Sequence, residues 1–406
     1  MEVTLWFSLV KDMAIGKTNI RNLTILVGST TVVLVTAGLA PALPGIALAF
    51  QDMPNAELLV RLTLTMPALL GAIGAPFAGI LLDRWGRKPV IVAALILYGL
   101  AGTAGYVLNS LTGILLSRTV LGLAMAGLAN GFVTLLADYF SGARLHQFSG
   151  YLGAFAGFGG VVYQILAGFL ADIGWRYPFL IYLIAFVILF SVLFTIDEPQ
   201  LRAQSELQDP PDERAADRLP AILTIYGIGL ASMVTVFTLI INLPFYLTTQ
   251  AGASSSQVGL ALSFLSLPGA IIALRYSRLK TRLSFQALAG VVFLNLGISH
   301  IVPALTPSYG LIVAGLLVGG LGFGLFFPNL VSWLASIAPT AVRGRAVGGL
   351  NATVFLGLFI TPILTQPLVD RAGVAGTFGI AGGISILLTV VLIGGRLMQS
   401  LTLRKR

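Results

Sequence analysis

The sequence predicts an all-α membrane protein with twelve transmembrane helices arranged as two pseudo-symmetric six-helix bundles. Three observations support this fold class: the scarcity of charge, twelve apolar runs of spanning length, and a partial internal repeat. Hydrophobic residues make up 57% of the 406 residues and charged residues only 10%, whereas soluble domains carry about 25% charged residues. With a mean hydropathy of +0.94, too few charges remain to cover a water-facing surface, so we expect most of the surface to face lipid.

Each predicted helix is an apolar run long enough to cross the hydrocarbon core, which takes about 20 residues. The first six runs form an N-terminal half, 23–196, and the other six form a C-terminal half, 220–397. The preceding segment, 1–22, has no small-residue cleavage site after its short apolar stretch and does not read as a signal peptide, so we expect the first long apolar run to be retained as a helix. The runs are 23–49, 58–82, 89–108, 112–137, 147–171, 177–196, 220–249, 257–275, 285–304, 310–337, 347–369 and 377–397.

The segment between the halves, 197–219, contains seven of the fifteen acidic residues and is predicted to be a solvated linker. Of the 24 Lys and Arg residues, twenty fall on the same side of the membrane as this linker. Three fall on the other side, namely Arg61, Arg176 and Arg371. The remaining one, Arg118, lies within a predicted helix. Because basic residues favour the cytoplasmic side, we expect the segment 1–22, the linker and the tail 398–406 to be cytoplasmic.

The two halves share a partial repeat at an offset of 198 residues. The segment Ile165-Leu166, with Leu170 and Asp172, recurs as Ile363-Leu364, with Leu368 and Asp370. Basic loops also recur at matching places, 83–88 against 277–282. Internal duplication of this kind is typical of secondary transporters, whose substrate site lies between the repeats near the middle of the membrane.

The loop between the second and third predicted helices, 79–89, reads GILLDRWGRKP. It resembles the signature of the major facilitator superfamily, G-x-L-x-D-R-x-G-R-K, and the resemblance extends over the chain through helix number, linker and duplication. Two further segments are similar to the family, Arg118–Gly122 on helix four and 168–176 after helix five. The second copy of the loop lacks the Asp and Gly, and 153–160, GAFAGFGG, lacks a proline common in drug antiporters. The resemblance implies a bacterial transporter of the drug- or sugar-efflux-like branch.

The loop motif has a physical interpretation. Gly79 lets helices approach closely, and Gly86 permits a tight turn. Asp83 can pair with arginine and cap a neighbouring helix N-terminus, and Asp138 is a candidate partner for the arginines of the loop. The resemblance implies that this cluster locks the outward-open state. The alternative is that its basic residues only fix the topology; they are Arg84, Arg87 and Lys88.

Arg118 is predicted to lie inside the fourth helix, where burial of a charge costs at least about 2.5 kcal/mol. It therefore needs a cavity or a polar partner: it either takes part in proton coupling or substrate attraction, or bonds backbone carbonyls and holds helices together. No Asp or Glu lies deep in any predicted span, which argues against a buried carboxylate as proton carrier. Arg118 could modulate coupling without titrating, the substrate could carry the proton, or transport could be uncoupled.

Polar and aromatic residues on the helices that surround the cavity in this family are candidates for substrate contacts. Each could equally be an interhelical hydrogen bond. Two pairs share a helix face at a spacing of four residues and are the stronger candidates, Asn242 with Tyr246 and Asn329 with Trp333. The others are Thr36, Asn130, Tyr163, Gln164, Tyr226, Asn351 and Gln366. A cavity with this lining suits an amphipathic or neutral organic solute.

The resemblance implies a secondary transporter that moves a small organic solute across the bacterial inner membrane by alternating access, in proton-coupled efflux. The alternatives are an uncoupled facilitator or an uptake carrier for an organic anion and, from a different class, a non-transporting receptor. The complete loop motif favours a transporter. The sequence has no cysteine, metal-ligand cluster or nucleotide-binding loop, so we expect no metal, no cofactor and no enzymatic activity. We expect a monomer whose partners are a small-molecule substrate, protons and membrane lipid; the basic residues are too scattered for nucleic acid.

Overall fold

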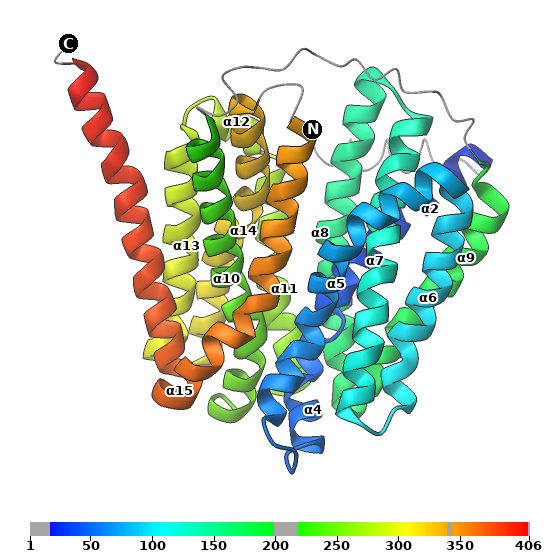
Figure 1. Ribbon diagram of the computed structural model, residues 1–406. Coiled ribbons are helices and arrows are strands. Elements are labelled where there is room, and N and C mark those ends of the chain that lie inside the picture. Colours follow the sequence, from blue (N-terminus) through cyan, green and yellow to red (C-terminus); the bar gives the residue numbers. More distant parts are fainter. Residues whose placement is uncertain (1–16, 199–217, 339–342, 405–406) are drawn as a thin grey trace.

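The computed structural model describes residues 17–198, 218–338 and 343–404, and these ranges contain helices and no strand (Figure 1). The N-terminal half contains α2 (Lys17–Ser29), α3 (Thr31–Ala37), η1 (Ala40–Ala42), α4 (Leu43–Ala49), α5 (Ala56–Trp85), α6 (Arg87–Val107), α7 (Leu111–Tyr139), α8 (Gly142–Ile173), η2 (Tyr177–Leu183) and α9 (Ile184–Thr195). The C-terminal half contains α10 (Leu219–Gln250), α11 (Ser255–Ala273), α12 (Tyr276–Lys280), α13 (Phe285–Leu305), α14 (Tyr309–Ile337) and α15 (Arg343–Arg404).

Eleven helices in the described ranges are long and apolar enough to cross a membrane. The last of them, 345–394, contains two spans, because Gly373 interrupts α15 with φ 70° and ψ 174°. The chain reverses direction within α15, as Figure 1 shows. The runs expected at 347–369 and 377–397 lie on either side of this glycine, so the prediction of about twelve membrane helices is confirmed.

The first span is a broken helix built from α2, α3, η1 and α4. The break after α2 lies at Thr30, whose hydroxyl donates to the carbonyl of Val27 at 2.7 Å and thereby competes with the helical pattern. Pro41 and Pro44 lack the amide hydrogen that a continuous helix needs. The apolar run predicted at 23–49 therefore crosses the membrane in short pieces.

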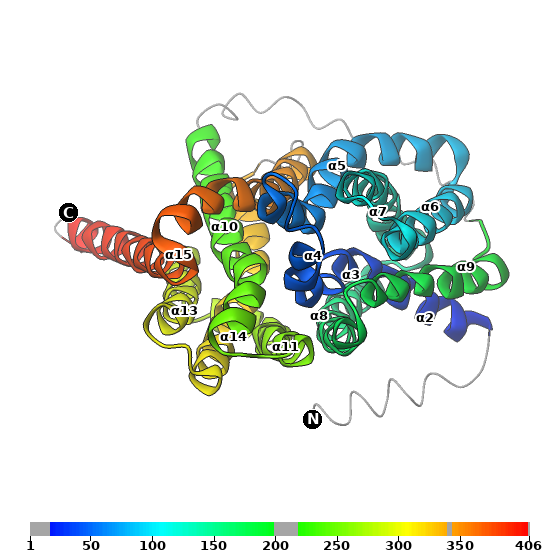
Figure 2. The same cartoon turned by 90° about the horizontal axis from the view of Figure 1, so that it is seen from below.

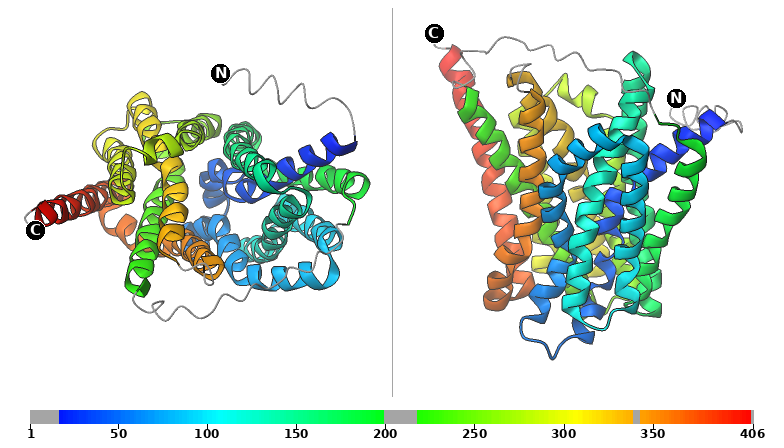
Figure 3. Two further views of the ribbon diagram at one scale, coloured as in Figure 1. Left: turned by 90° about the horizontal axis from the view of Figure 1, so that it is seen from above. Right: turned by 45° about the vertical axis from the view of Figure 1, so that its right-hand side comes forward.

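The two halves stand side by side, as the views along the bundle show (Figures 2 and 3). The start of α2, the end of α9, the start of α10 and the end of α15 all lie on one face, which we call the linker face. The other end is the opposite face. The halves meet along two edges, where α5 lies beside α15 and α8 lies beside α11.

Close helix packing within each half depends on small residues. A Cβ placed on Gly122 of α7 would lie 2.8 Å from the Cα of Pro67 in α5. In the C-terminal half, a Cβ on Gly320 of α14 would lie 3.2 Å from the Cβ of Pro268 in α11. Side chains at these glycines would separate the helices, so corresponding helix pairs in the two halves pack by the same device.

The halves are joined on the opposite face and apart on the linker face. One hydrophobic cluster contains Leu43 and Val60 from the N-terminal half together with Leu243 and Leu262 from the C-terminal half, each fully buried. This cluster closes the space between the halves on the opposite face. On the linker face the space between the halves remains open and forms a cavity. The conformation is therefore open toward the linker face.

Candidate functional site

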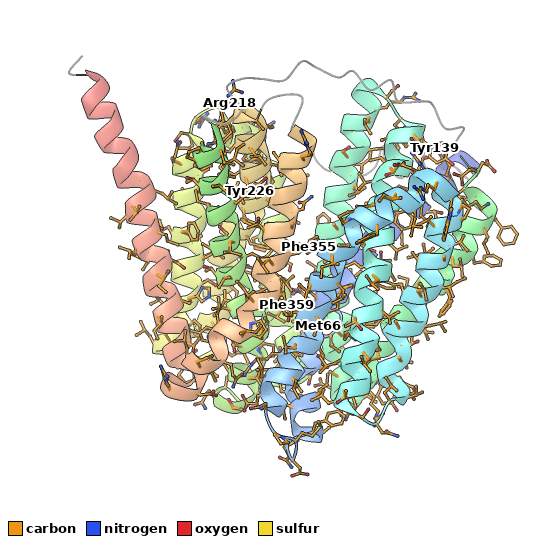
Figure 4. All side chains as sticks on the ribbon, in the orientation of Figure 1. Met66, Tyr139, Arg218, Tyr226, Phe355 and Phe359 are labelled. Carbon is orange, nitrogen blue, oxygen red and sulfur yellow. The ribbon has the colours of Figure 1, made fainter. Side chains whose placement is uncertain are left out.

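A cavity of about 1050 Å³ lies between the halves and extends to the linker face. Its walls come from α5 and α7 on one side and from α14 and α15 on the other. Met125, Phe327 and Phe355 give it apolar walls. Figure 4 shows Phe355, Phe359 and Met66 between the two halves. We call this space the central cavity.

Two amides, the hydroxyl of Thr134 and two charged groups supply the polarity of the central cavity. Asn130 donates from Nδ2 to the carbonyl of Ala75 at 2.8 Å, and Asn351 lines the same cavity from α15. Asp83 and Arg87 lie at the end of the cavity nearest the linker face. Among the described lining residues, Asp83 is the only acid and Arg87 the only base. Most of the cavity therefore offers apolar surface with scattered hydrogen-bonding groups.

The loop motif is fixed by a set of charge-assisted hydrogen bonds. Gly86 has φ +94°, and a Cβ there would lie 2.6 Å from Oε1 of Glu198, so only glycine fits this turn. Glu198 accepts from the backbone amides of Arg87 and Lys88 at 2.6 and 2.8 Å. Lys88 donates from Nζ to the carbonyl of Leu193 at 2.9 Å. The turn therefore holds the N-terminus of α6 against the end of α9.

Arg87 connects three elements on the linker face. Its Nε lies 3.0 Å from Oδ2 of Asp138, and its Nη1 lies 3.0 Å from Oδ1 of Asp83 and 2.7 Å from the carbonyl of Leu82. The structure thus contains an ion pair between Asp138 and one of the two arginines considered from the sequence, while the Arg84 side chain is exposed. The Asp83 side chain is 75% exposed, and within the described ranges its carboxylate pairs with Arg87 alone.

Gly79 differs from the expectation. A Cβ there would meet no atom within 4 Å, and the residue lines the central cavity. Its expected close helix contact is not made in this conformation, because the halves are apart at this level.

Arg61 and its neighbours close the opposite face, and we call this cluster the opposite-face gate. Arg61 is 1% exposed and lies 3.2 Å from Glu57 on the same helix. Across the halves it donates to the side-chain oxygen of Gln366 and places its guanidinium 4.7 Å from the centre of the Phe245 ring. Gln366 in turn donates to Asp370 at 2.8 Å. A buried cation thus joins α5 to α10 and α15.

The other edge between the halves is closed by backbone and side-chain hydrogen bonds. Asp172, at the end of α8, accepts from the amide of Ser256 in the first turn of α11 at 3.1 Å. Ser266 donates to Gln164 at 3.0 Å. Asp172 and Asp370 are the two carboxylates related by the sequence repeat. The repeat therefore places a carboxylate beside the other half at each edge.

A family model described as Major Facilitator Superfamily matches residues 25–283 and 225–402. The chain belongs to this superfamily. It is a multi-pass membrane transporter of small molecules rather than an enzyme.

Relatives and solved structures agree with this assignment. The quinolone resistance protein NorA of Staphylococcus aureus (strain MSSA476) is 24% identical over 356 residues, covering 83% of this chain and 87% of that protein. The bacillibactin exporter of Bacillus subtilis (strain 168) is 25% identical over 360 residues, covering 85% and 89%. The crystal structure of a D-xylose–proton symporter has a TM-score of 0.75 at 16% identity, covering 93% and 97%. The transporter therefore has the fold of a symporter and is similar in sequence to a resistance protein and an exporter.

Arg118 of the transporter lies away from the central cavity. It is fully buried, donates from Nη2 to the carbonyl of Gly102 at 2.9 Å, and lies 4.8 and 5.0 Å from the rings of Phe179 and Tyr182. Its Nε and Nη1 have no hydrogen-bond partner among the described residues. Of the two alternatives drawn from the sequence, this geometry matches the arginine that bonds a backbone carbonyl and holds helices together.

Of the residues expected to line the cavity, Asn130 and Asn351 do so. The two favoured pairs face the interior of the C-terminal half instead. Asn242 donates to Thr238 on its own helix at 2.9 Å, and the Tyr246 ring lies 5.7 Å from that of Phe378. Asn329 donates to the carbonyl of Phe285 at 3.0 Å, and Trp333 stacks on the same residue at 5.9 Å. These polar groups satisfy backbone carbonyls, the usual use of amides between membrane helices.

The remaining expected residues also make contacts within or between helices. Thr36 donates to Val33 at 3.2 Å, and Tyr163 bonds Thr30 at 2.6 Å. Tyr226 donates to the carbonyl of Ala346 at 2.6 Å, and Figure 4 shows it in the C-terminal half. Gln164 and Gln366 lie at the two edges where the halves meet.

Sequence reasoning missed Arg61 and Glu198. The distribution of basic residues predicts only that Arg61 lies on the side of the membrane opposite the linker, and Glu198 falls in the predicted solvated linker, 197–219. The signal for Arg61 was an isolated cation six residues into an apolar helix. Glu198 follows the sixth span by three residues, close enough to reach the loop motif.

Proposed function

We propose that this transporter exports an amphipathic organic solute by alternating access, with the central cavity as its binding site. The observation that carries the proposal is a large, mostly apolar cavity between the halves that is open on one face and sealed on the other by cross-half contacts. A site with one accessible side at a time is what alternating access requires.

The linker face is proposed to be the cytoplasmic face of the bacterial plasma membrane. Twenty of the 24 Lys and Arg residues fall on this side and three on the other, an imbalance that favours cytoplasmic placement. With this orientation the cavity receives substrate from the cytoplasm. That direction agrees with the export and resistance functions named for the two relatives.

The proposed substrate is amphipathic because the cavity walls are rings, a thioether and small apolar side chains. Asn130 and Asn351 offer hydrogen bonds from opposite halves, so a solute that reaches both would stabilise closure around itself. The described lining of the cavity contains one carboxylate, Asp83, which would favour neutral or cationic solutes over organic anions at the cavity entrance. A volume of about 1050 Å³ is at the upper end of the usual range for small-molecule sites.

Asp83 is proposed to lock the linker face when it closes. In this conformation its carboxylate is exposed and lines the cavity with Gly348 and Asn351, near the start of α15. Closure would bring it to the N-terminus of that helix, where a negative charge is stabilised. The lock would then be made in one state and broken in the other.

Proton coupling remains part of the proposal, with transport in proteoliposomes as its test. A quinolone and a fluorescent organic cation serve as probes, because NorA is named for quinolone resistance. We expect uptake into vesicles to require an imposed pH gradient and to stop when an uncoupler dissipates it. Uptake that ignores the gradient indicates an uncoupled facilitator. Specific binding of either probe without any flux would favour a receptor and contradict the proposal.

A further inference from the structure

A second cavity, of about 620 Å³, lies at the linker-face end of the N-terminal half. Its lining comes from α2, α7, α8 and the short connection between α7 and α8, and it shares no residue with the central cavity. It is therefore separate from the proposed transport site. We call it the interfacial pocket, because the membrane-spanning parts of these helices begin or end beside it, at residues 19, 139 and 147.

The rim of the interfacial pocket is cationic. Arg21 is half-buried with its guanidinium 4.1 Å from the centre of the Tyr139 ring, and Arg144 is exposed on the opposite wall. The described residues that line the pocket include no acid. Two acidic residues, Asp197 and Glu198, lie near Tyr139. The Tyr139 hydroxyl donates to the backbone carbonyl of Asp197. The Glu198 carboxylate accepts from two backbone amides of the loop motif.

Hydrogen-bonding groups in the pocket are left unused. Nε of Arg21 and Oδ1 of Asn22 are buried and have no hydrogen-bond partner within the described part of the chain. Orphaned buried polar atoms carry a desolvation penalty of about 1–3 kcal/mol each. A ligand that accepts from the arginine would remove part of this penalty.

The pocket is amphipathic along the membrane normal. Phe140 and Phe148 stack at 4.0 Å on its wall. Leu26 and Phe155 line it five residues beyond Arg21 and eleven beyond Arg144, about 8 and 16 Å further along their helices at 1.5 Å per residue. Charge at the membrane surface with apolar wall below matches a molecule whose anionic head joins a hydrocarbon body.

We propose that the interfacial pocket binds the phosphate headgroup of an anionic phospholipid, with an acyl chain along its deeper wall. Basic pockets between helices at the membrane surface are suited to such headgroups, and guanidinium groups bind phosphate oxygens in pairs. The shared chemistry is a phosphate ester, so free phosphate is the alternative ligand. The site does not depend on the direction of transport or on which face is cytoplasmic.

The test measures lipid retention by the purified full-length protein. Native mass spectrometry compares phosphatidylglycerol with phosphatidylcholine, added to protein in detergent at matched concentrations. We expect phosphatidylglycerol to bind at least about tenfold more tightly, and Arg21→Gln with Arg144→Gln to remove that preference. The matched control removes two exposed arginines of the same face outside the pocket, Arg278→Gln with Arg282→Gln, and should keep it.

Three outcomes would overturn the proposal. The first is an unchanged preference in the pocket variant, and the second is an equal loss in the control variant, which indicates diffuse attraction to charge. The third is full displacement of the lipid by millimolar inorganic phosphate or glycerol 3-phosphate, which assigns the site to a free anion. If the double variant does not fold, Arg144→Gln alone still tests the site, because this side chain is exposed, and Phe148→Ala tests the apolar wall.

Discussion

Replacing Gln366 with leucine should release the opposite-face gate. Gln366 is the side chain of α15 that accepts from the buried guanidinium of Arg61 on α5. Leucine has a similar volume but no acceptor, so the variant leaves part of a buried charge without its partner. When the gate opens, water can hydrate Arg61, so the loss falls on the closed conformation alone.

The size of the effect follows from these contacts. Arg61 is 1% exposed, and a hydrogen bond to a charged group contributes about 1.5–3 kcal/mol. The ion pair with Glu57 lies within α5, so we expect it in both conformations and leave it out of the difference. A loss of about 2 kcal/mol shifts the equilibrium roughly 30-fold. A closed gate populated at about 99% would then fall to roughly three quarters.

Distances between spin labels can report this shift. The chain contains no cysteine, so labels can be attached without removing native thiols. Thr112→Cys and Ser308→Cys place labels on exposed residues of the opposite face, one in each half. Ser149→Cys and Ser336→Cys do the same on the linker face. We expect the first distance to lengthen and the second to shorten in the Gln366→Leu variant.

The control is Gln250→Leu, the same replacement at an exposed residue on the same face. It should leave both distance distributions as they are in the parent. A Gln366→Leu variant whose populations stay within about twofold of the parent would refute the reasoning about the gate. Lengthening of both distances together would indicate unfolding rather than rocking of the halves.

Further substitutions test other parts of the account. Asp83→Asn should leave folding intact and reduce flux at least about tenfold, since a neutral amide loses its attraction to a helix N-terminus; near-normal flux in proteoliposomes removes the locking role. Gly86→Ala forces a positive φ and a steric clash, costing about 1–2 kcal/mol or more, whereas Gly79→Ala has open space; only the first should lower the thermal unfolding midpoint. Arg118→Met removes a buried charge held by one carbonyl and two rings, so thermal stability should change while flux per folded molecule stays normal; a selective loss of pH-driven flux would restore a coupling role. Asn351→Leu should raise the KM for a polar substrate in the same flux assay with little effect on stability, and an unchanged KM would remove this residue from the binding site.

The fold was predictable because membrane-spanning helices require long apolar runs, which the hydropathy of the sequence shows directly. Each span must satisfy its own backbone and face lipid, so apolar runs of spanning length identify helices directly. The loop motif was also predictable, since Gly86, Arg87 and Asp83 are local neighbours whose turn geometry and charge are fixed by short-range sequence. The chain reversal at Gly373 follows the same logic, because glycine adopts the positive φ it requires.

The cavity was harder to predict because a membrane helix is apolar on several sides. A spacing of four residues places Asn242 beside Tyr246, yet it does not tell which neighbour that face meets. In a soluble protein the polar face would mark the solvent side, but here an amide can serve helix packing as well as substrate. For Arg61 the sequence failed in the opposite way, since it did not predict that this charged side chain is buried. Its burial arises from contact with the other half, 305 residues away at Gln366, which no local pattern encodes.

Where α8 crosses α11, Gly168 and Gly259 bring the main chains of the two halves into direct contact. A Cβ on Gly168 would lie 2.6 Å from the carbonyl of Ser255 and 2.9 Å from the Cα of Ser256. Two bodies in contact through bare backbone have no interlocking side chains to disengage as they turn. The halves can therefore rotate against each other at this crossing, and resistance to that rotation comes from the polar contacts elsewhere along the two edges, such as Ser266 with Gln164 and Arg61 with Gln366. A single methyl group at either glycine would push the two helices apart at this crossing.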